Sequence, residues 1–111
     1  MDNFIIEEFD FYKVVLHTDT ANDNVDCGIH IKLASGAAYL RYSKNNTRTN
    51  SYVKKGNFFD FNCYMDLDKY PMHIDILRYE KPLFFFYNLD TNKAYITTSD
   101  EPVGEEESSD D

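Results

Sequence analysis

The sequence predicts a mainly β protein, a small single-domain antiparallel barrel or sandwich of about six or seven strands. Three observations support this class. Several short segments alternate apolar and polar residues, which is the period of a half-buried strand. Nine Phe and nine Tyr residues supply side chains that favour strands. Short stretches rich in Asn, Asp, Gly and Ser separate these segments, and no segment keeps a helical period over three turns.

The clearest alternation runs through residues 58–67, "FFDFNCYMDL". One predicted face is apolar and consists of Phe59, Phe61, Cys63, Met65 and Leu67. The opposite face consists of Asp60, Asn62, Tyr64 and Asp66. In residues 27–33, Ile29, Ile31 and Leu33 likewise point away from His30 and Lys32. Further strands are expected at residues 11–18, 37–42, 51–55, 72–79, 82–87 and 93–98.

Four segments need a more specific interpretation. Residues 2–10 could form a short N-terminal helix capped by Asp2 or Asn3. Residues 71–80 begin with a proline that suits a helix start, but Ile74 and Ile76 favour a strand. Residues 82–87 are apolar on both faces, which predicts a central strand covered on both sides and the middle of a meander. Residues 38–55 are interpreted as a hairpin with a tip at 44–50.

Charge is distributed unevenly along the chain, whose formal net charge is −9. The last twelve residues carry seven acids and no base: Asp100, Glu101, Glu105, Glu106, Glu107, Asp110 and Asp111. Residues 1–99 therefore have a net charge of only −2. With one apolar side chain, Val103, the tail cannot offset the entropy of ordering. We expect a compact β domain over 1–99 and a disordered acidic tail over 100–111, which contacts a partner or solubilises the protein.

A basic island stands out in residues 41–56, "RYSKNNTRTNSYVKKG", which contain five bases and no acid. Bases of a single strand stack on aromatic rings while cations follow the phosphates. The island and its flank therefore give a candidate nucleic-acid site: Tyr39, Arg41, Tyr42, Lys44, Arg48, Tyr52, Lys54 and Lys55. The alternatives are a protein contact or a solvated arm whose lysines prevent edge pairing.

A β domain with exposed aromatics, a basic arm and an acidic C-terminal tail resembles, in layout, the single-strand-binding proteins of bacteria and phages. The resemblance implies an OB-type barrel and a tail that recruits partner proteins. This chain ends in Asp110-Asp111, where that group commonly has a terminal aromatic residue.

The sequence contains no pattern that predicts catalysis, a metal site or a cofactor. The histidines His17, His30 and His73 have no short spacing to another His or Cys. Asp60, Asp66 and Asp68 are expected to be solvated acids on a strand face. Cys27 and Cys63, 36 residues apart, are expected to be reduced core thiols.

No signal peptide is evident, and the longest apolar run, 83–87, is too short to span a membrane. We therefore expect a soluble protein in the cytoplasm, or inside a host cell if the source is viral. Residues encoded by AT-rich codons (Phe, Tyr, Met, Ile, Asn and Lys) number 46, against 15 Gly, Ala, Arg and Pro. That bias is typical of viruses, phages and low-GC bacteria.

The leading hypothesis is a non-enzymatic protein that binds single-stranded nucleic acid, with a tail that competes for the site or recruits a partner. A second is a protein-binding or inhibitor module that meets a basic partner through its acidic tail or through Asp60, Asp66 and Asp68, by mimicking nucleic acid. A third is a small-ligand barrel lined by Phe59, Phe61, Phe84 and Phe86. Oligomeric state is left open.

Overall fold

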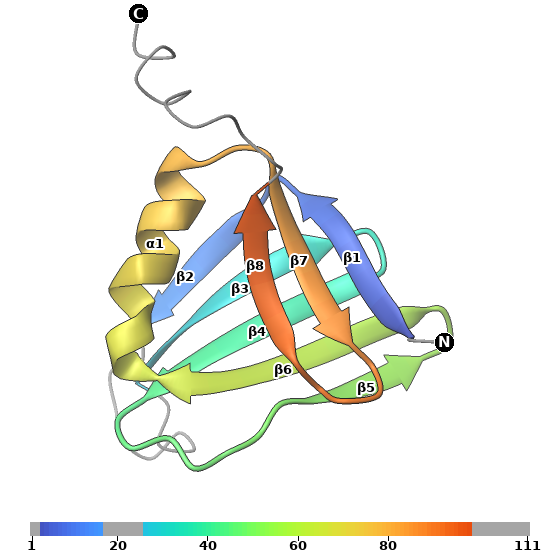
Figure 1. Ribbon diagram of the computed structural model, residues 1–111, viewed down its shortest axis with the longest axis horizontal. Helices are drawn as coiled ribbons and strands as arrows, with labels where there is room; N and C mark the ends of the chain where they lie inside the picture. Colours follow the sequence, from blue (N-terminus) through green and yellow to red (C-terminus); the bar gives the residue numbers. More distant parts are fainter. Residues whose placement is uncertain (1–2, 17–25, 99–111) are drawn as a thin grey trace, which may run out of the picture.

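The computed structural model describes residues 3–16 and 26–98, and this part of the chain is mainly β, as predicted (Figure 1). The described strands are β1 (Phe4–Phe9), β2 (Tyr12–Leu16), β3 (Cys27–Leu33), β4 (Gly36–Ser43), β5 (Ser51–Lys55), β6 (Phe58–Asp66), β7 (Leu83–Asn88) and β8 (Ala94–Thr98). A 3-10 turn, η1 (Leu67–Lys69), leads into one helix, α1 (Tyr70–Tyr79). The predictions for His17 and for the acidic tail concern residues outside the described ranges.

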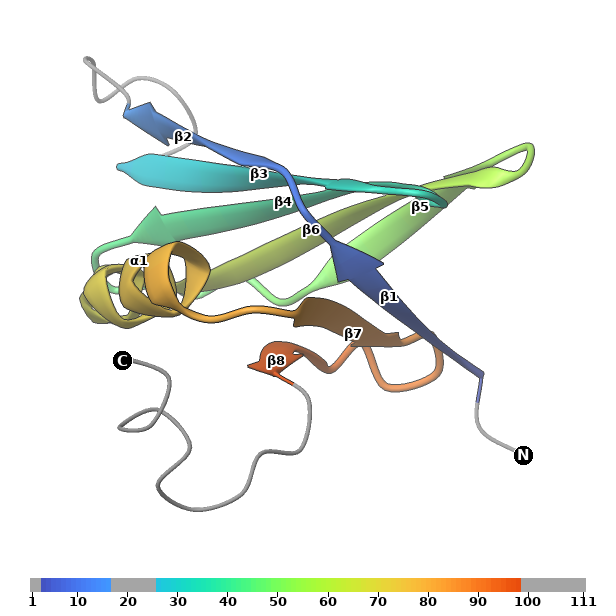
Figure 2. The same ribbon diagram turned by 90° about the horizontal axis from the view of Figure 1, so that it is seen from above.

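The strands form two layers. One is a five-stranded sheet with the order β2-β3-β4-β6-β5, and the other is a three-stranded sheet with the order β1-β7-β8. Helix α1 lies beside the three-stranded sheet, on the same side of the larger sheet (Figure 2). These are two separate sheets and not a closed barrel, so the sandwich alternative describes the fold and the OB-type barrel implied by the resemblance does not.

The two sheets are joined by β1 and β2, which follow each other with only residues 10–11 between them. The chain leaves the three-stranded sheet at Phe9 and enters the five-stranded sheet at Tyr12. Between them, the Phe11 carbonyl accepts a hydrogen bond of 3.1 Å from the Lys32 N–H. This bond extends the β2–β3 ladder by one residue pair, Phe11 and Lys32.

The predicted hairpin over 38–55 is wrong. Strand β4 pairs in parallel with β6, and β5 pairs antiparallel with β6 at the sheet edge. Residues 44–50 therefore carry the chain past β6 before a tight turn at Gly56 brings it back. Burial explains this order. A strand inside the sheet has a neighbouring strand on each side, which helps to cover the apolar side chains of β6.

Gly36 permits the close approach of β4 and β6. Its φ is +147°, and a Cβ built there would lie 1.9 Å from the carbonyl oxygen of Phe59. The Phe59 N–H donates to the Ser35 carbonyl over 2.7 Å at the same point. Only a glycine fits this contact.

Residues 72–79 form part of helix α1, so the predicted strand there is wrong. Pro71 occupies the first turn, where its missing N–H costs nothing. Tyr70, His73, Ile74 and Leu77 share the side of the helix that is partly or fully buried. This i, i+3, i+4, i+7 spacing outweighs the strand preference of two isoleucines.

The N-terminal segment is strand β1, not a helix. It pairs antiparallel with β7 along its whole length. The prediction that 82–87 is a central strand is confirmed, since β7 lies between β1 and β8, but the predicted meander is wrong because one neighbour is β1 and not residues 72–79. Its inner side chains Leu83, Phe85 and Tyr87 are buried, whereas Phe84 and Phe86 on the outer face are only half-buried. The expectation that both faces of this strand are covered is therefore wrong for its outer face.

The core lies between the two sheets, and its four largest fully buried side chains are aromatic. Phe61 is fully buried, with ring centroids 4.7 Å from Tyr87 and 5.4 Å from Phe85. Burial of each such side chain contributes about 1.5–3 kcal/mol. Cys27 and Cys63 are buried free thiols, as predicted, and burial raises the pKa of Cys63 to about 12. Helix α1 is too short and polar to be a membrane span, and it is the sole α-helix in the described ranges.

Candidate functional site

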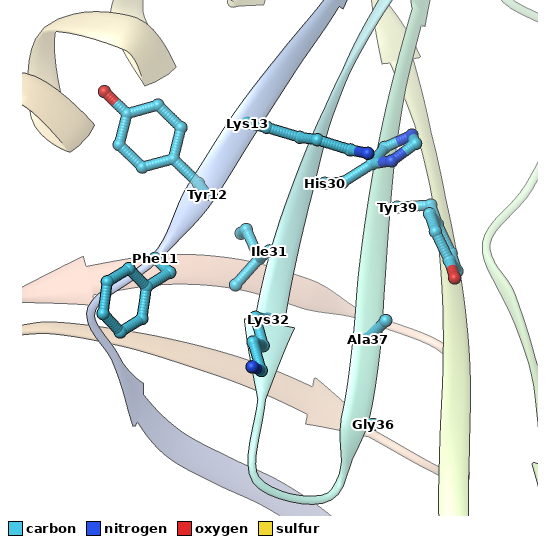
Figure 3. A pocket seen from close by; sticks show the side chains of 9 residues that line it. All are labelled: Phe11, Tyr12, Lys13, His30, Ile31, Lys32, Gly36, Ala37 and Tyr39. Atoms are coloured by element: carbon cyan, nitrogen blue, oxygen red, sulfur yellow. The ribbon is translucent and has the colours of Figure 1, made fainter.

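The outer face of the five-stranded sheet has a shallow hollow of about 370 Å³ over β2, β3 and β4 (Figure 3). It is lined by Phe11, Tyr12, Lys13, His30, Ile31, Lys32, Gly36, Ala37 and Tyr39. On this face Ala37 has only a methyl group, while larger side chains stand on either side of it, which leaves the hollow.

Strand register determines which side chains reach this face. Lys13, His30 and Tyr39 lie opposite one another on β2, β3 and β4 and form one row across the sheet. Phe11 is level with Lys32, to which its carbonyl is bonded, and forms the next row. Because side chains alternate between faces, both rows point away from the core.

Aromatic rings stand at both ends of the hollow. Phe11 is 71% exposed, and the half-buried Tyr39 ring packs edge-on against His30 with centroids 4.9 Å apart. Phe11 and Tyr39 are two strands and two residues apart, which separates their Cα atoms by roughly 12 Å. At that distance each ring can stack on a separate base.

The charged side chains that line the hollow are lysines, and one carboxylate, Asp60, lies beside Ala37 on the same face. Lys13 and Lys32 are exposed, and in Figure 3 the Lys13 ammonium extends toward His30. Arg41 borders the hollow, with its guanidinium 5.3 Å from the Tyr39 ring centroid. The Arg41 Nη2 donates to Asn62 Oδ1 over 3.2 Å, which holds the guanidinium on the sheet surface. None of the nine described lining residues is a carboxylate.

Of the predicted nucleic-acid site, Tyr39 and Arg41 belong to this face. Arg48 lies 5.5 Å from the ring centroid of Tyr64, further along the same face. Lys55 is at the sheet edge, where its Nζ is 3.6 Å from Asp60 and its charge is partly balanced. Lys44 is exposed in the connection after β4.

The other three predicted residues point inward. Tyr42 is fully buried, and Tyr52 packs against Phe61 and Tyr87 between the sheets. Lys54 lies on that side too, 5.7 Å from the Phe59 ring centroid. The eight residues are thus divided between two faces, because neighbours in a strand point in opposite directions. For Tyr42 and Tyr52 the predicted stacking role is wrong.

Tyr42 instead joins the sheet to α1. Its hydroxyl lies 2.6 Å from His73 Nδ1. Burial, and secondarily Lys69, lower the pKa of His73, so the neutral ring accepts the hydrogen bond. Burial also raises the pKa of Tyr42, which stays protonated and donates. This pair is structural.

The acidic strand face does not exist as a single surface. Strand β6 ends at Asp66, so Asp68 lies in η1 and not beside Asp60. Asp66 accepts a 3.0 Å hydrogen bond from the Asn46 N–H. No cluster of three or more His, Cys, Asp or Glu suited to a metal occurs among the described residues.

The small-ligand barrel is contradicted by the positions of its proposed lining residues. Phe59 and Phe61 stack inside the sandwich, 5.3 Å apart. Phe84 and Phe86 lie on the outer face of the other sheet. No single interior is lined by all four rings.

Sequence reasoning missed Phe11, Lys13, His30 and Lys32. Part of the signal was present, since the alternation in 27–33 put His30 and Lys32 on the face away from Ile29. What was missing is that β3 lies between β2 and β4, which brings these cations beside Tyr39 and Arg41.

The fold and this surface define a small two-layer β protein with a basic, aromatic sheet face. In comparisons with known proteins, no family model, curated protein or solved structure matches the chain.

Proposed function

We propose that this protein binds single-stranded nucleic acid on the hollowed outer face of the five-stranded sheet. Phosphates lie over Lys13, Lys32 and Arg41, and bases stack on Phe11 and Tyr39. The observation that carries the proposal is the co-location of three cations and two accessible rings on one face, with no carboxylate among the described lining residues.

Two features favour a single strand over a duplex. Rings that stand on an open sheet stack only on bases that are free of their own neighbours. Duplex binding depends on many phosphate contacts, and residues 1–99 have a net charge of −2. Local charge and stacking together suit a short single-stranded segment.

The acidic tail is proposed to compete for the same face. Thr98 is level with Leu83, which is level with Phe9 on β1, and the chain from Phe9 leads directly to Phe11. The thirteen residues that follow Thr98 span at most about 45 Å when extended, which exceeds the short distance to the hollow. Seven tethered carboxylates then act at a high effective concentration.

A salt titration tests this proposal. Fluorescence anisotropy of a labelled oligothymidine is measured with the full chain and with a 1–99 truncation. Three phosphate contacts predict a slope of about −2 in log K against log salt for the truncation. Absence of binding by both proteins at about 50 mM salt would refute the proposal.

A further inference from the structure

A second recess, unrelated to the basic face, lies between α1 and β8. It has a volume of about 330 Å³. Helix α1 and β8 stand side by side over the inner face of the large sheet in both views (Figures 1 and 2). The groove between them has apolar side chains from β4, β6 and β7 at its floor: Leu40, Cys63, Met65 and Phe85.

One wall of the groove is the edge of a sheet. Strand β8 is last in the order β1-β7-β8. The Asn88 N–H donates to the Lys93 carbonyl over 2.8 Å, which makes this a hydrogen-bonded pair. The antiparallel alternation then directs the backbone groups of Tyr95 toward β7 and those of Ala94 and Ile96 outward. No backbone hydrogen bond among the described residues reaches these outward groups.

The recess follows this edge and not merely one face of β8. Ala94, Tyr95 and Ile96 are consecutive, and all three line it. A recess on one face would be lined only by alternate residues. An extended backbone laid here therefore meets donors and acceptors at strand spacing, as when a peptide adds to a sheet edge.

The opposite wall and the rim define the side chains that fit. Met72, which is 59% exposed, and Ile76 project from α1 into the groove. Together with the apolar floor, they fit a peptide strand in which every second side chain is apolar and points into the groove. Lys69 is the charged side chain among the described lining residues, histidine aside, and it favours a carboxylate at that end.

We propose that an extended peptide segment of a partner protein docks here as a fourth strand beside β8. It carries apolar side chains at alternate positions and one acidic residue near Lys69. The protein's own tail fits less well, because Val103 is its single apolar residue. Strand β8 of a second copy fits less well too, because Ala94–Thr98 contains no carboxylate.

The test uses the full-length protein, labelled with nitrogen-15, and two acetylated, amidated peptides of alternating valine and threonine. One has glutamate at its N-terminus and the other at its C-terminus, since either strand direction is open. At least one peptide is expected to shift the amide signals of Ala94, Ile96 and Met72. It is also expected to slow hydrogen exchange at Ala94 and Ile96 about tenfold at saturation.

Two sets of N-methylated peptides give the control for edge pairing. In one set, the methylated amides are those whose N–H groups would face β8. In the other set, the methylated amides are those that would face away from β8. One set is expected to weaken binding at least about tenfold and the other to leave it nearly unchanged. Lys69→Glu is expected to weaken binding about threefold, while Lys81→Glu, on an exposed lysine outside the groove lining, leaves it unchanged.

Three results would overturn this proposal. The first is no shift at these residues up to millimolar peptide. The second is equal tolerance of both N-methylated sets, which means apolar contact without strand addition. The third is that the groove is already occupied. Either sedimentation shows a dimer, or the peptide binds only the 1–99 truncation, which means that the tail fills the groove in the full chain.

Discussion

The hydroxyl of Tyr42 on β4 and Nδ1 of His73 on α1 lie 2.6 Å apart at a partly buried contact between the sheet and the helix. Tyr42 also packs edge-on against the ring of Tyr70, the first residue of the helix. Both contacts attach α1 to the five-stranded sheet. The helix therefore has a defined position next to β8, and the pair is a sensitive point for stability.

Stability should fall as the pH falls below about 6.5. The pKa of His73 is lowered in the folded state by burial, so the unfolded chain binds the proton more readily. The His73 contribution is complete above the ordinary value of 6.5 and is lost as the pH drops toward the lowered pKa. Urea unfolding at pH 7.5 and 5.5 measures it. His73→Gln should flatten the dependence, and an unchanged slope in this variant contradicts the account.

Tyr42→Phe should lower the free energy of unfolding by about 1–3 kcal/mol at pH 7.5, because His73 loses its buried hydrogen-bond partner. Chemical denaturation measures the change. Tyr79→Phe is the matched control, since Tyr79 is 76% exposed and should show almost no effect. Equal effects of the two substitutions would mean that Tyr42 is not buried in solution.

Gly36→Ala should be far more destabilising than Gly56→Ala. Both glycines have positive φ, but only Gly36 places a new Cβ against the Phe59 backbone; nothing lies within 4 Å at Gly56. We expect about 1 kcal/mol for Gly56→Ala and about 3 kcal/mol or more for Gly36→Ala. Thermal or urea unfolding checks this. Similar values would argue against the parallel β4–β6 pairing.

Phe11→Ala should weaken oligothymidine binding by about 1–3 kcal/mol, the range for loss of one stacked base. Because Phe11 is 71% exposed, the folded state should be little affected. Tyr79→Ala removes an equally exposed ring from α1 and should bind normally. Binding unaffected by Phe11→Ala would remove this ring from the site.

Removal of the tail should tighten oligonucleotide binding and raise its dependence on salt. The 1–99 truncation loses the seven carboxylates that, in the proposed competition, bind the basic face. We expect several-fold tighter binding at about 50 mM salt, with the difference vanishing near 0.5 M as the charges are screened. Titration of the two proteins side by side shows whether the tail competes, and weaker binding by the truncation would indicate a supporting role instead.

Local patterns predicted the faces of single strands well. Phe61 and Cys63 are buried and Asn62 and Tyr64 face outward because period-2 alternation is a property of one strand alone. The order of strands was not predictable in this way. The position of β6 between β4 and β5 depends on the close contact at Gly36, and no pattern in the residues around Gly36 predicts that contact.

The prediction for residues 72–79 was wrong, and the residues of the predicted site were divided between two faces, for related reasons. Pro71 and the spacing of Tyr70, His73, Ile74 and Leu77 carried a helical signal, but two isoleucines outweighed it. For the site, the basic island is contiguous in sequence, whereas a surface is contiguous across strands. Lys13 and Lys32 come beside Tyr39 only through the pairing of β2, β3 and β4.

The most direct test of the proposed function compares two paired charge reversals in the 1–99 protein. Lys13→Glu with Lys32→Glu alters the hollow, and Lys54→Glu with Lys55→Glu alters the basic island in the same number of charges. Oligothymidine affinity is measured by anisotropy at about 50 mM salt. The account predicts that the first pair abolishes binding and the second weakens it less than about threefold. Loss of binding only in the second pair would contradict it.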